Sequence, residues 1–343
     1  MIIHNIINDK WRRNNAENID VVVSSTVRLA RNLKGYPFPN RLDDIEKIEV
    51  ASKIIAELKR SNSAIADDLN ILNLYELKKD EVMSLVERNL ISYDFALARG
   101  ENYLLLSNDN KLSVMINEQD HIRLQAITKG LDLENVYKSA DRLDTLIDSC
   151  VTYAFNENFG YLTQCPTNLG TGMCASVKLH LHALNHSKSI NRISTNLSKL
   201  GLSLKGENGE GSISKDGMYQ LSNQVTLGIS EQTALENLKN ITKQLVAQEK
   251  AVREELSKNI EYLDAVSRAR GVLTSARILN YDECAKLLSY VRLGVAIGEI
   301  TDISIVDVDE LMLYCKPSII ALQNSEQEQE EVFRANLIRA KLK

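Results

Sequence analysis

YLLLSNDNKLSVMINEQDHIR, residues Tyr103 to Arg123, carries a good hairpin signal and ends in a dense polar cluster. Two apolar runs, Tyr103 to Ser107 and Lys111 to Asn117, flank the tripeptide Asn108-Asp109-Asn110. Asn and Asp tolerate the backbone conformations of tight turns, so the pattern predicts a β-hairpin and with it an antiparallel sheet.

The second strand of this hairpin runs into Asn117-Glu118-Gln119-Asp120-His121, and Arg123 follows two residues later. Two carboxylates, an amide, an imidazole and a guanidinium at a strand end are groups that a catalytic cluster uses. A polar strand-to-loop junction has the same composition, so both interpretations are open on this stretch alone. The neutral Gln119 between two acids is the unexpected feature.

Length and composition set the broad class. The 343 residues suggest two domains, and 44% hydrophobic with 25% charged residues is typical of a soluble globular protein. A net charge of -5 gives no electrostatic case for nucleic acid.

No apolar run approaches the ~20 residues of a membrane helix, and the first residues do not resemble a secretory signal. Five widely spaced cysteines without a CxxC pair indicate neither a disulfide framework nor a zinc site, which favours a cytoplasmic protein.

Elements around the hairpin follow from periodicity. IDVVVSS, Ile19 to Ser25, predicts a short strand that ends at the polar run, with Arg28 and Arg31 just beyond it. Residues 43–100 carry mostly helical spacing. Further strands are predicted at Tyr161 to Gln164, Gly201 to Lys205 and Met218 to Ser222, and helices at Leu143 to Phe155 and Gly172 to Leu184.

The C-terminal part has a different composition. Ile229 to Arg270 lacks Gly and Pro and repeats leucine at helical spacing, which predicts at least two helices with Ser230 as a cap. Asn280 resembles the start of a capping box, and Asp307 to Cys315 predicts a helix stopped by Pro317. Gln323 to Glu331 is interpreted as a loop or helix start. We therefore divide the chain into a domain of residues 1–250 and a helical domain of residues 251–343.

Three more polar clusters interrupt the apolar pattern: SSTVRLARN from Ser24, CPTNLGTGMCASVKLHLHAL from Cys165, and KGENGEGSISKDGMYQLSNQVTLG from Lys205. In the second, Thr167 to Gly172 is a Gly- and Thr-rich loop before a predicted helix, where free N–H groups would bind an anion; a loop that only caps the helix is the alternative. The third suits a mobile loop closing over a ligand, or an ordinary surface loop.

Together these clusters resemble one family. The chain carries, in this order, the motifs SSxxRLARN, NExDHIR, CPTNLGTGxxASV, GEGS and QLSNQxTLG. These motifs are similar to those of the ATP:guanidino phosphotransferases, and among them to those of the bacterial protein-arginine kinases. The segment RGVLTSARIL resembles part of the helical extension of these kinases. The resemblance covers about Ile19 to Lys343. It implies an α+β fold: a small helical N-terminal region, an antiparallel sheet flanked by helices as in phosphagen kinases, and a C-terminal all-helical domain.

The resemblance also implies an activity and a site. The γ-phosphoryl group of ATP, carried with Mg²⁺, would pass to arginine side chains of proteins; no residue is expected to hold a metal directly. The catalytic positions implied are Glu118, Gln119, Asp120, Glu210 and Cys165. The nucleotide-binding positions implied are Ser24, Ser25, Thr26, Val27, Arg28, Arg123, Cys174, Ala175, Ser176, Val177, Lys178, Lys205, Gly206, Glu207, Asn208, Gly209 and Glu210.

Several residues depart from the family pattern. Gln119 stands where the family has the acid that binds and deprotonates the guanidinium, and losing a general base typically costs ~10²–10⁴ in rate. Thr26, Cys174 and Lys205 stand where the family has arginines. Lys178, expected one helical turn after Cys174, is a candidate to restore one charge, although an exposed surface lysine is the plainer interpretation. Two hypotheses follow: a protein-arginine kinase with reduced activity, or a pseudokinase that serves as a binding scaffold or regulator.

The remaining expectations concern partners and ions. The resemblance implies protein substrates with exposed arginines, a homodimer formed by the helical domain, an activating adaptor and a Clp-type protease, with no role for nucleic acid or membrane. In the family an RDxxRA motif reads phosphoarginine; here Glu330-Glu331-Val332-Phe333-Arg334-Ala335 keeps only the last two, which predicts loss of that feedback. His180, His182 and His186 lack an accompanying carboxylate cluster, so no metal site is predicted.

Overall fold

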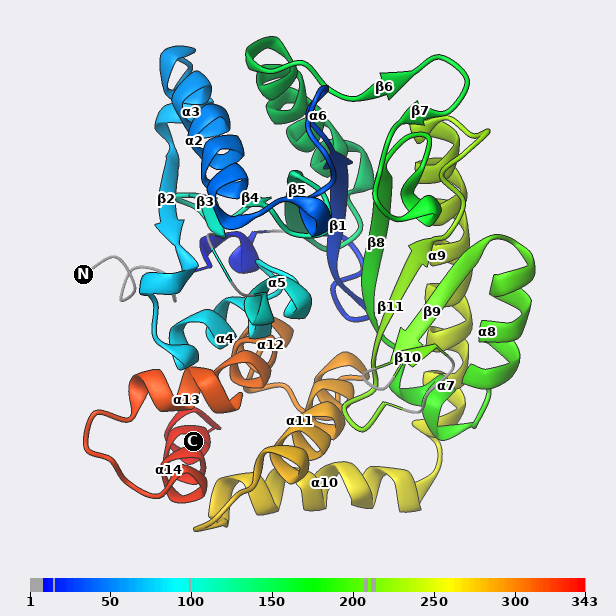
Figure 1. Cartoon of the computed structure of the whole chain (residues 1–343). Coiled ribbons are helices and arrows are strands. Elements are labelled where there is room, and N and C mark those ends of the chain that lie inside the picture. The colour runs from blue at the N-terminus through cyan, green and yellow to red at the C-terminus, as the bar shows by residue number, and fades with distance from the viewer. Residues whose placement is uncertain are drawn as a thin grey trace.

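A nine-stranded antiparallel sheet forms the centre of the computed structural model, which describes residues 9–14, 16–98, 100, 102–206, 209–210 and 214–342 (Figure 1). The strand order in these residues is β10-β9-β11-β8-β1-β5-β4-β3-β2. The bounds are β1 Val22–Arg31, β2 Leu69–Asn73, β3 Tyr103–Ser107, β4 Leu112–Ile116, β5 Ile122–Lys129, β8 Met173–His180, β9 Leu202–Gly206, β10 Gly209–Glu210 and β11 Met218–Asn223; β6 Phe155–Asn156 and β7 Gly160–Tyr161 form a separate hairpin.

The predicted hairpin is confirmed. β3 and β4 pair antiparallel with Leu105 opposite Val114, and the turn between them contains Asn110 at φ +58. An asparagine tolerates this left-handed conformation better than a residue with a bulkier, branched side chain does. The hairpin joins the sheet through β4 and β5, and β5 carries the polar stretch onward beside β1.

Helices account for most of the other residues that the structure describes. Their bounds are α2 Asp44–Arg60, α3 Ala64–Asp67, α4 Lys79–Glu87, α5 Tyr93–Leu97, α6 Leu133–Cys150, α7 His182–His186, α8 Ile190–Lys199, α9 Glu231–Leu256, α10 Ile260–Ser275, α11 Tyr281–Ala296, α12 Ile305–Tyr314, α13 Pro317–Gln323 and α14 Glu330–Leu342, with short 3-10 turns η1 Lys10–Arg13, η2 Pro39–Arg41, η3 Leu74–Glu76 and η4 Pro166–Asn168. This arrangement confirms the predicted α+β fold.

One face of the central sheet is apolar and packs on helices. Val27 and Leu29 of β1 alternate with polar residues, and they share a fully buried core with Val177 of β8 and with Leu143 of α6. Because successive strand residues point to opposite faces, this burial leaves Ser24, Thr26 and Arg28 on the other face. The helical N-terminal region, α2 to α5, lies between β1 and β3 in the chain, and a second core joins α4 and α5 to β2–β4.

The C-terminal helices α10 to α14 have a core of their own, in which Leu288, Val308 and Ile338 are fully buried. Ser230 caps α9 and Asn280 caps α11, as predicted, by accepting the backbone N–H groups of Thr233 and Glu283. The predicted helix at Asp307 is α12, and Pro317 begins the next helix. α9 continues to Leu256, so the boundary placed between residues 250 and 251 falls inside a helix; the two-domain division itself stays a prediction.

Four element predictions are wrong. β1 does not end at Ser25 but continues through Arg31, because Val27 and Leu29 still alternate into the core. Gly172 to Leu184 is not a helix: Ala175, Val177 and Leu179 alternate with polar residues and form β8. The helix expected from Leu143 to Phe155 is α6, which begins at Leu133 and ends at Cys150. The chain then leaves the helix, and Tyr153 forms an isolated antiparallel β-bridge with Leu33. Of Tyr161 to Gln164, only Tyr161 is in a strand.

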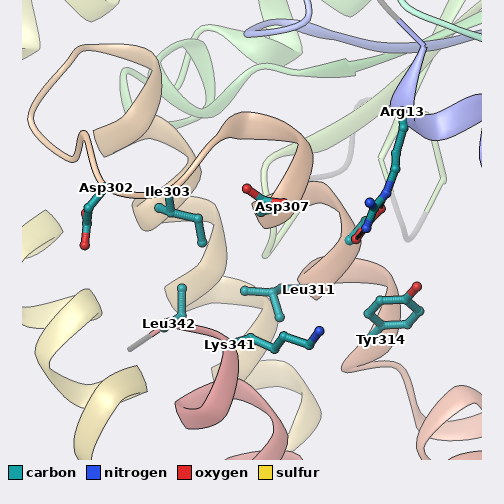
Figure 2. Close-up of a pocket in the computed structure, with 9 residues that line it drawn as sticks. Arg13, Asp302, Ile303, Asp307, Leu311, Tyr314, Lys341 and Leu342 are labelled. Carbon is teal, nitrogen blue, oxygen red and sulfur yellow. Dashed lines mark hydrogen bonds and ion pairs between the residues drawn. The ribbon is translucent and has the colours of Figure 1, made fainter.

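The N-terminal segment is fastened to the C-terminal helices. Arg13 donates from Nε and Nη2 to the two carboxylate oxygens of Glu310 in α12, at 2.6 and 2.8 Å. Figure 2 shows Arg13 reaching toward α12 beside Tyr314, at one side of a pocket of about 210 Å³ whose other labelled residues come from the loop before α12, from α12 and from α14. This pocket is a feature of the junction and contains none of the site residues named above.

Candidate active site

The polar face of the central sheet brings together residues from three strands. Directly opposed residues of antiparallel strands point to the same face. Arg28 is opposite both Gln125 of β5 and Cys174 of β8, and Thr26 is opposite Ser176. One row further, Arg123 is opposite Ala30. The sheet therefore gathers Arg28, Arg123, Cys174, Thr26 and Ser176 on one surface, as the predicted nucleotide site requires.

Four of the predicted nucleotide-binding residues point the other way. Val27, Ala175 and Val177 belong to the core on the apolar face. Ser25 is fully buried there, and its hydroxyl donates to Gly130 O at 2.7 Å and accepts from Asp132 N at 3.1 Å. The side chains of these four residues support the fold, and only their backbone atoms are open to a role in binding.

Arg28 and Arg123 form the cationic centre of the polar face. Arg28 Nε donates to Gln125 Oε1 at 2.6 Å, and Arg28 makes no ion pair with any carboxylate of the described residues. Burial and then the positive charge of Arg123 lower the pKa of the Arg28 guanidinium. A cation held in this way is stabilised by a bound anion, because opposite charge favours its protonated form.

Glu118 is tied to this centre. Arg123 Nη1 donates to both Glu118 carboxylate oxygens at 2.7 Å, and Ser92 at the start of α5 donates a third hydrogen bond. Burial alone would raise the pKa of the Glu118 carboxyl, but the charge and hydrogen bonds of Arg123 and Ser92 outweigh it and hold that pKa below its ordinary value. A carboxylate with a lowered pKa is a weaker proton acceptor.

The neighbours of Glu118 differ from it in exposure. Gln119 is exposed, whereas Asp120 and His121 are buried. Asp120 Oδ1 accepts from Asn32 Nδ2 at 2.6 Å and from Gln164 N at 2.8 Å, and burial raises the pKa of this carboxyl. His121 Nδ1 accepts from Leu33 N at 3.1 Å, and burial lowers its pKa to about 4. Asp120 and His121 therefore fix the loop, and Gln119 is the side chain that faces solvent.

The loop that carries Cys165 lies beside this cluster. Asp120 holds Gln164, the residue before the cysteine, and Cys165 Sγ lies 3.0 Å from Thr167 Oγ1. Thr226 Oγ1 lies within hydrogen-bond distance of both Thr167 O, at 2.8 Å, and Leu169 O, at 2.7 Å, and so ties the loop to the segment after β11. The expected anion site at a helix start is wrong, because Gly172 leads into strand β8.

The structure describes the loop that follows Lys205 only in part. Lys205 is exposed at the end of β9, opposite both Gln220 and Glu210, and Gly206 is opposite Gly209. Glu207 and Asn208 lie outside the described residues, as does the side chain of Glu210. The expected roles of Lys205 and Glu210 stay predictions.

Lys178 does not lie one helical turn from Cys174. Both are in β8 and on the same face, but four strand steps place their Cα atoms roughly 13 Å apart. Lys178 is opposite Ser24, and its surroundings belong to the junction with the C-terminal helices. Burial and the charge of Lys316 lower the pKa of the Lys178 amine to about 8. The interpretation as an exposed surface lysine is also wrong.

Two supporting residues escaped the sequence reasoning. Gln125 holds Arg28 and is itself anchored by Asn89 O, to which its Nε2 donates at 2.7 Å. Ser92 holds Glu118 from α5. Gln125 is two residues after Arg123, so both side chains of a strand there lie on the same face, and this alternation could have identified it.

Two histidines at the end of β8 and the start of α7 contact the C-terminal helices. His180 Nε2 and His182 Nδ1 lie 2.8 and 2.7 Å from the hydroxyl of Ser289 in α11. Within the described residues, no group of three or more His, Cys, Asp or Glu side chains is placed to hold a metal ion.

Comparison with known proteins decides the family. The family model "ATP:guanido phosphotransferase, C-terminal catalytic domain" matches residues 49–252, which is more than half of the chain, and "Protein-arginine kinase McsB C-terminal domain" matches residues 259–343. The chain belongs to the ATP:guanido phosphotransferase family. Membership in this family implies the use of ATP.

Relatives in this family match along nearly the whole chain. The protein-arginine kinase of Clostridium tetani is 40% identical over 340 residues, covering 98% of this chain and 99% of that protein. The protein-arginine kinase of Geobacillus sp. (strain WCH70) is 40% identical over 338 residues, covering 97% and 93%.

Solved phosphotransferase structures share the fold. The taurocyamine kinase of Schistosoma mansoni superposes with a TM-score of 0.61 at 26% identity, over 67% of this chain and 33% of that one. A lombricine kinase superposes with a TM-score of 0.59 over 73% and 71% of the two chains, and at 23% identity this likeness shows the fold alone.

Among the described residues, no helix is both long and apolar enough to cross a membrane.

Proposed function

We propose that this protein is a protein-arginine kinase whose phosphoryl transfer from ATP is reduced or lost. The observation that carries the proposal is the pair Arg28 and Arg123 on the polar face of the sheet, next to Glu118. Forked guanidinium groups grip phosphate oxygens, and Mg²⁺ that arrives with the nucleotide supplies the remaining neutralisation. Thr26 lines the same face with a hydroxyl where an arginine would bind phosphate more strongly.

Reduced activity follows from the state of the carboxylates. A target guanidinium with a pKa above ~12 must lose a proton to a base, and Gln119 cannot accept one. Glu118 is paired with Arg123 through both oxygens, and Asp120 is buried under two hydrogen bonds. Neither is free to replace the missing base without giving up a partner. The charge at Cys174 is also missing, and Lys178 lies too far along β8 to restore it.

The same observations support a second candidate, a pseudokinase that binds nucleotide or arginine as a scaffold or regulator. Its partners would be a second copy of the chain, an activating adaptor and a Clp-type protease. The Arg334 side chain supports the loss of phosphoarginine feedback: it is buried, pairs with Glu330, and donates to Cys315 O at 2.7 Å and Leu279 O at 3.0 Å. These contacts use three of the five guanidinium N–H groups, and a phosphate bound to Arg334 would compete with the Glu330 carboxylate.

Phosphoryl transfer tests the two candidates. γ-labelled ATP and an arginine-containing protein are incubated with the native chain and with Gln119→Glu. Label on arginine with the native chain supports the kinase. Transfer only by the variant, at a rate ~10²–10⁴ higher, means that one missing base silences an intact site.

If neither protein transfers label, nucleotide binding separates the remaining cases. A ligand at 100 times its dissociation constant adds ~2.7 kcal/mol to the free energy of unfolding. A thermal shift with Mg-ADP would then favour the nucleotide-binding pseudokinase, and no shift at millimolar nucleotide would count against both candidates.

A further inference from the structure

Large apolar side chains are exposed on the segments around the Cys165 loop. Phe155 and Phe159 in the β6–β7 hairpin are 57% and 51% exposed, and Leu200, Val225 and Leu227 are exposed to a similar degree. Single exposed apolar residues are ordinary, but a contiguous group of them marks an interaction surface. We call these five residues the apolar strip.

Backbone contacts make the strip continuous. Gly160, next to Phe159, packs against Gly170 so closely that no Cβ fits between them, and Gly170 packs in the same way against Thr226 and Leu227. Gly201, next to Leu200, packs against the Val225 side chain. In Figure 1 the hairpin lies beside the N-terminal end of α9, which begins four residues after Leu227.

The hairpin end of the strip is rigid. Asn156 Oδ1 accepts from the backbone of Asn158 at 2.9 Å and of Phe159 at 3.2 Å, which fixes the turn. The Phe155 ring meets Tyr161 edge to face at 5.2 Å between centroids, and Tyr161 lies 3.5 Å from the guanidinium of the buried Arg31. A preorganised aromatic pair loses little conformational freedom when a partner binds.

The strip also belongs to the two segments that position Cys165. The hairpin leads into Leu162 to Gln164, which Asn32 and Asp120 hold. Val225 and Leu227 flank Thr226, whose hydroxyl is within hydrogen-bond distance of Thr167 O and Leu169 O. A polypeptide that lies across these segments would therefore have an arginine within reach of the Cys165 loop.

Shape and charge around the strip suit such a polypeptide. At Leu200 the strip meets a groove of about 430 Å³ between α8 and α9, which Leu197, Ile241 and Leu245 also line. Glu157 is exposed in the hairpin turn, and the charges of Asp148 and Glu231 act on Tyr161. Arg192 lines the groove and Lys199 is exposed next to Leu200, so the hairpin end, with Glu157, is the end of the strip that complements an arginine.

We propose that the apolar strip is the docking surface for the substrate polypeptide, and that it selects arginines flanked by large apolar residues. This inference rests on the proposed function, because it takes a protein chain as the substrate. The flanking residues pack on Phe159 and Leu227 while the arginine reaches the Cys165 loop. Aromatic side chains at the centre of an interface contribute most of its binding energy.

Peptide binding without nucleotide tests this proposal. Two fluorescent peptides carry one arginine, flanked by leucines in the first and by serines in the second, and fluorescence anisotropy measures their affinities. We expect the leucine peptide to bind the native chain about tenfold more tightly, and Phe159→Ala or Leu227→Ala to remove that difference. Tyr75→Ala and Ile260→Ala, at residues 82% and 77% exposed elsewhere, are the matched controls and should bind as the native chain does.

Three results would overturn the docking surface: equal affinity for the two peptides, Phe159→Ala behaving like Tyr75→Ala, or Phe159→Ala converting a dimer to a monomer in sedimentation, which would make a second copy the occupant. Transfer to arginine that Phe159→Ala leaves unchanged would sink the docking surface but not the proposed function. Peptide binding without phosphoryl transfer by either the native chain or Gln119→Glu would contradict the kinase and still support the docking surface.

Discussion

The two ends of β8 use the same polar face in different ways. At the Cys174 end, Arg28 and Arg123 lie together and Arg28 has no carboxylate partner among the described residues. At the His180 end, the polar groups are buried and paired: His180 contacts Ser289 of α11, and Arg253 joins His180 O to Glu249. At the Cys174 end, positive charge remains available for a ligand. At the His180 end, the polar groups join two parts of the molecule.

This difference shows how burial separates binding from stability. A buried ion pair strongly destabilises a protein when one partner is removed, because the other charge is left without compensation. A partly buried cation cluster without a full set of carboxylate partners gains most when an anion binds. Substitutions at the two ends of β8 should therefore change different measured quantities.

The largest effect is expected at the His180 end. Glu249 is fully buried, accepts from Ala183 N and Leu184 N at 2.9 Å each, and pairs with Arg253 at 2.8 Å. Glu249→Ala should lower the free energy of unfolding by about 3–5 kcal/mol, measured by urea denaturation. The exposed pair Lys258–Glu254 has the same helical spacing, and Glu254→Ala should cost less than ~0.5 kcal/mol. Equal costs for the two variants would remove the distinction between the two ends.

A smaller effect on binding is expected at the Cys174 end. Cys174→Arg adds a second guanidinium group opposite Arg28. A charge-assisted contact from this group to phosphate contributes ~1.5–3 kcal/mol of binding free energy. The variant should therefore bind Mg-ADP about 10- to 150-fold more tightly, measured by calorimetry. Cys150→Arg, at the end of α6, is the control and should leave affinity unchanged. No gain from Cys174→Arg would mean that the phosphates lie elsewhere.

The third effect, which is smallest near neutral pH, is a pH dependence at the His180 end. Burial, then the charges of Arg253 and His186, lower the pKa of His182 to about 3, against an unfolded value near ~6.5. The unfolded chain binds the proton first, so the stability that neutral His182 contributes is complete above pH ~6.5 and is lost as pH falls toward 3. His182→Asn should flatten the slope of unfolding free energy against pH in this window by up to about 1.4 kcal/mol per pH unit. A slope that His182→Asn leaves unchanged would contradict the assignment.

The errors of sequence reasoning lie where two periods compete. Met173 to His180 alternates between residues of the apolar core and residues of the opposite face, but the glycine-rich loop before it and the apolar residues after it resemble a helical pattern. β1 was cut short at Ser25 because its polar residues resemble a strand end, although Val27 and Leu29 continue the buried alternation. Both errors arose where a strand carries the site, because a site needs polar residues inside an element.

By itself the sequence determined the antiparallel hairpin, the capped C-terminal helices, the family, and the absence of an acid at position 119. Motif order and local periodicity are enough for these conclusions, because they depend on neighbouring residues. Only the tertiary structure decided that Ser25 and Val177 support the core, that Lys178 belongs to the junction, and that Arg123 occupies both oxygens of Glu118. The reason is that the facing of a strand and the pairing of a charge depend on which distant elements cover them.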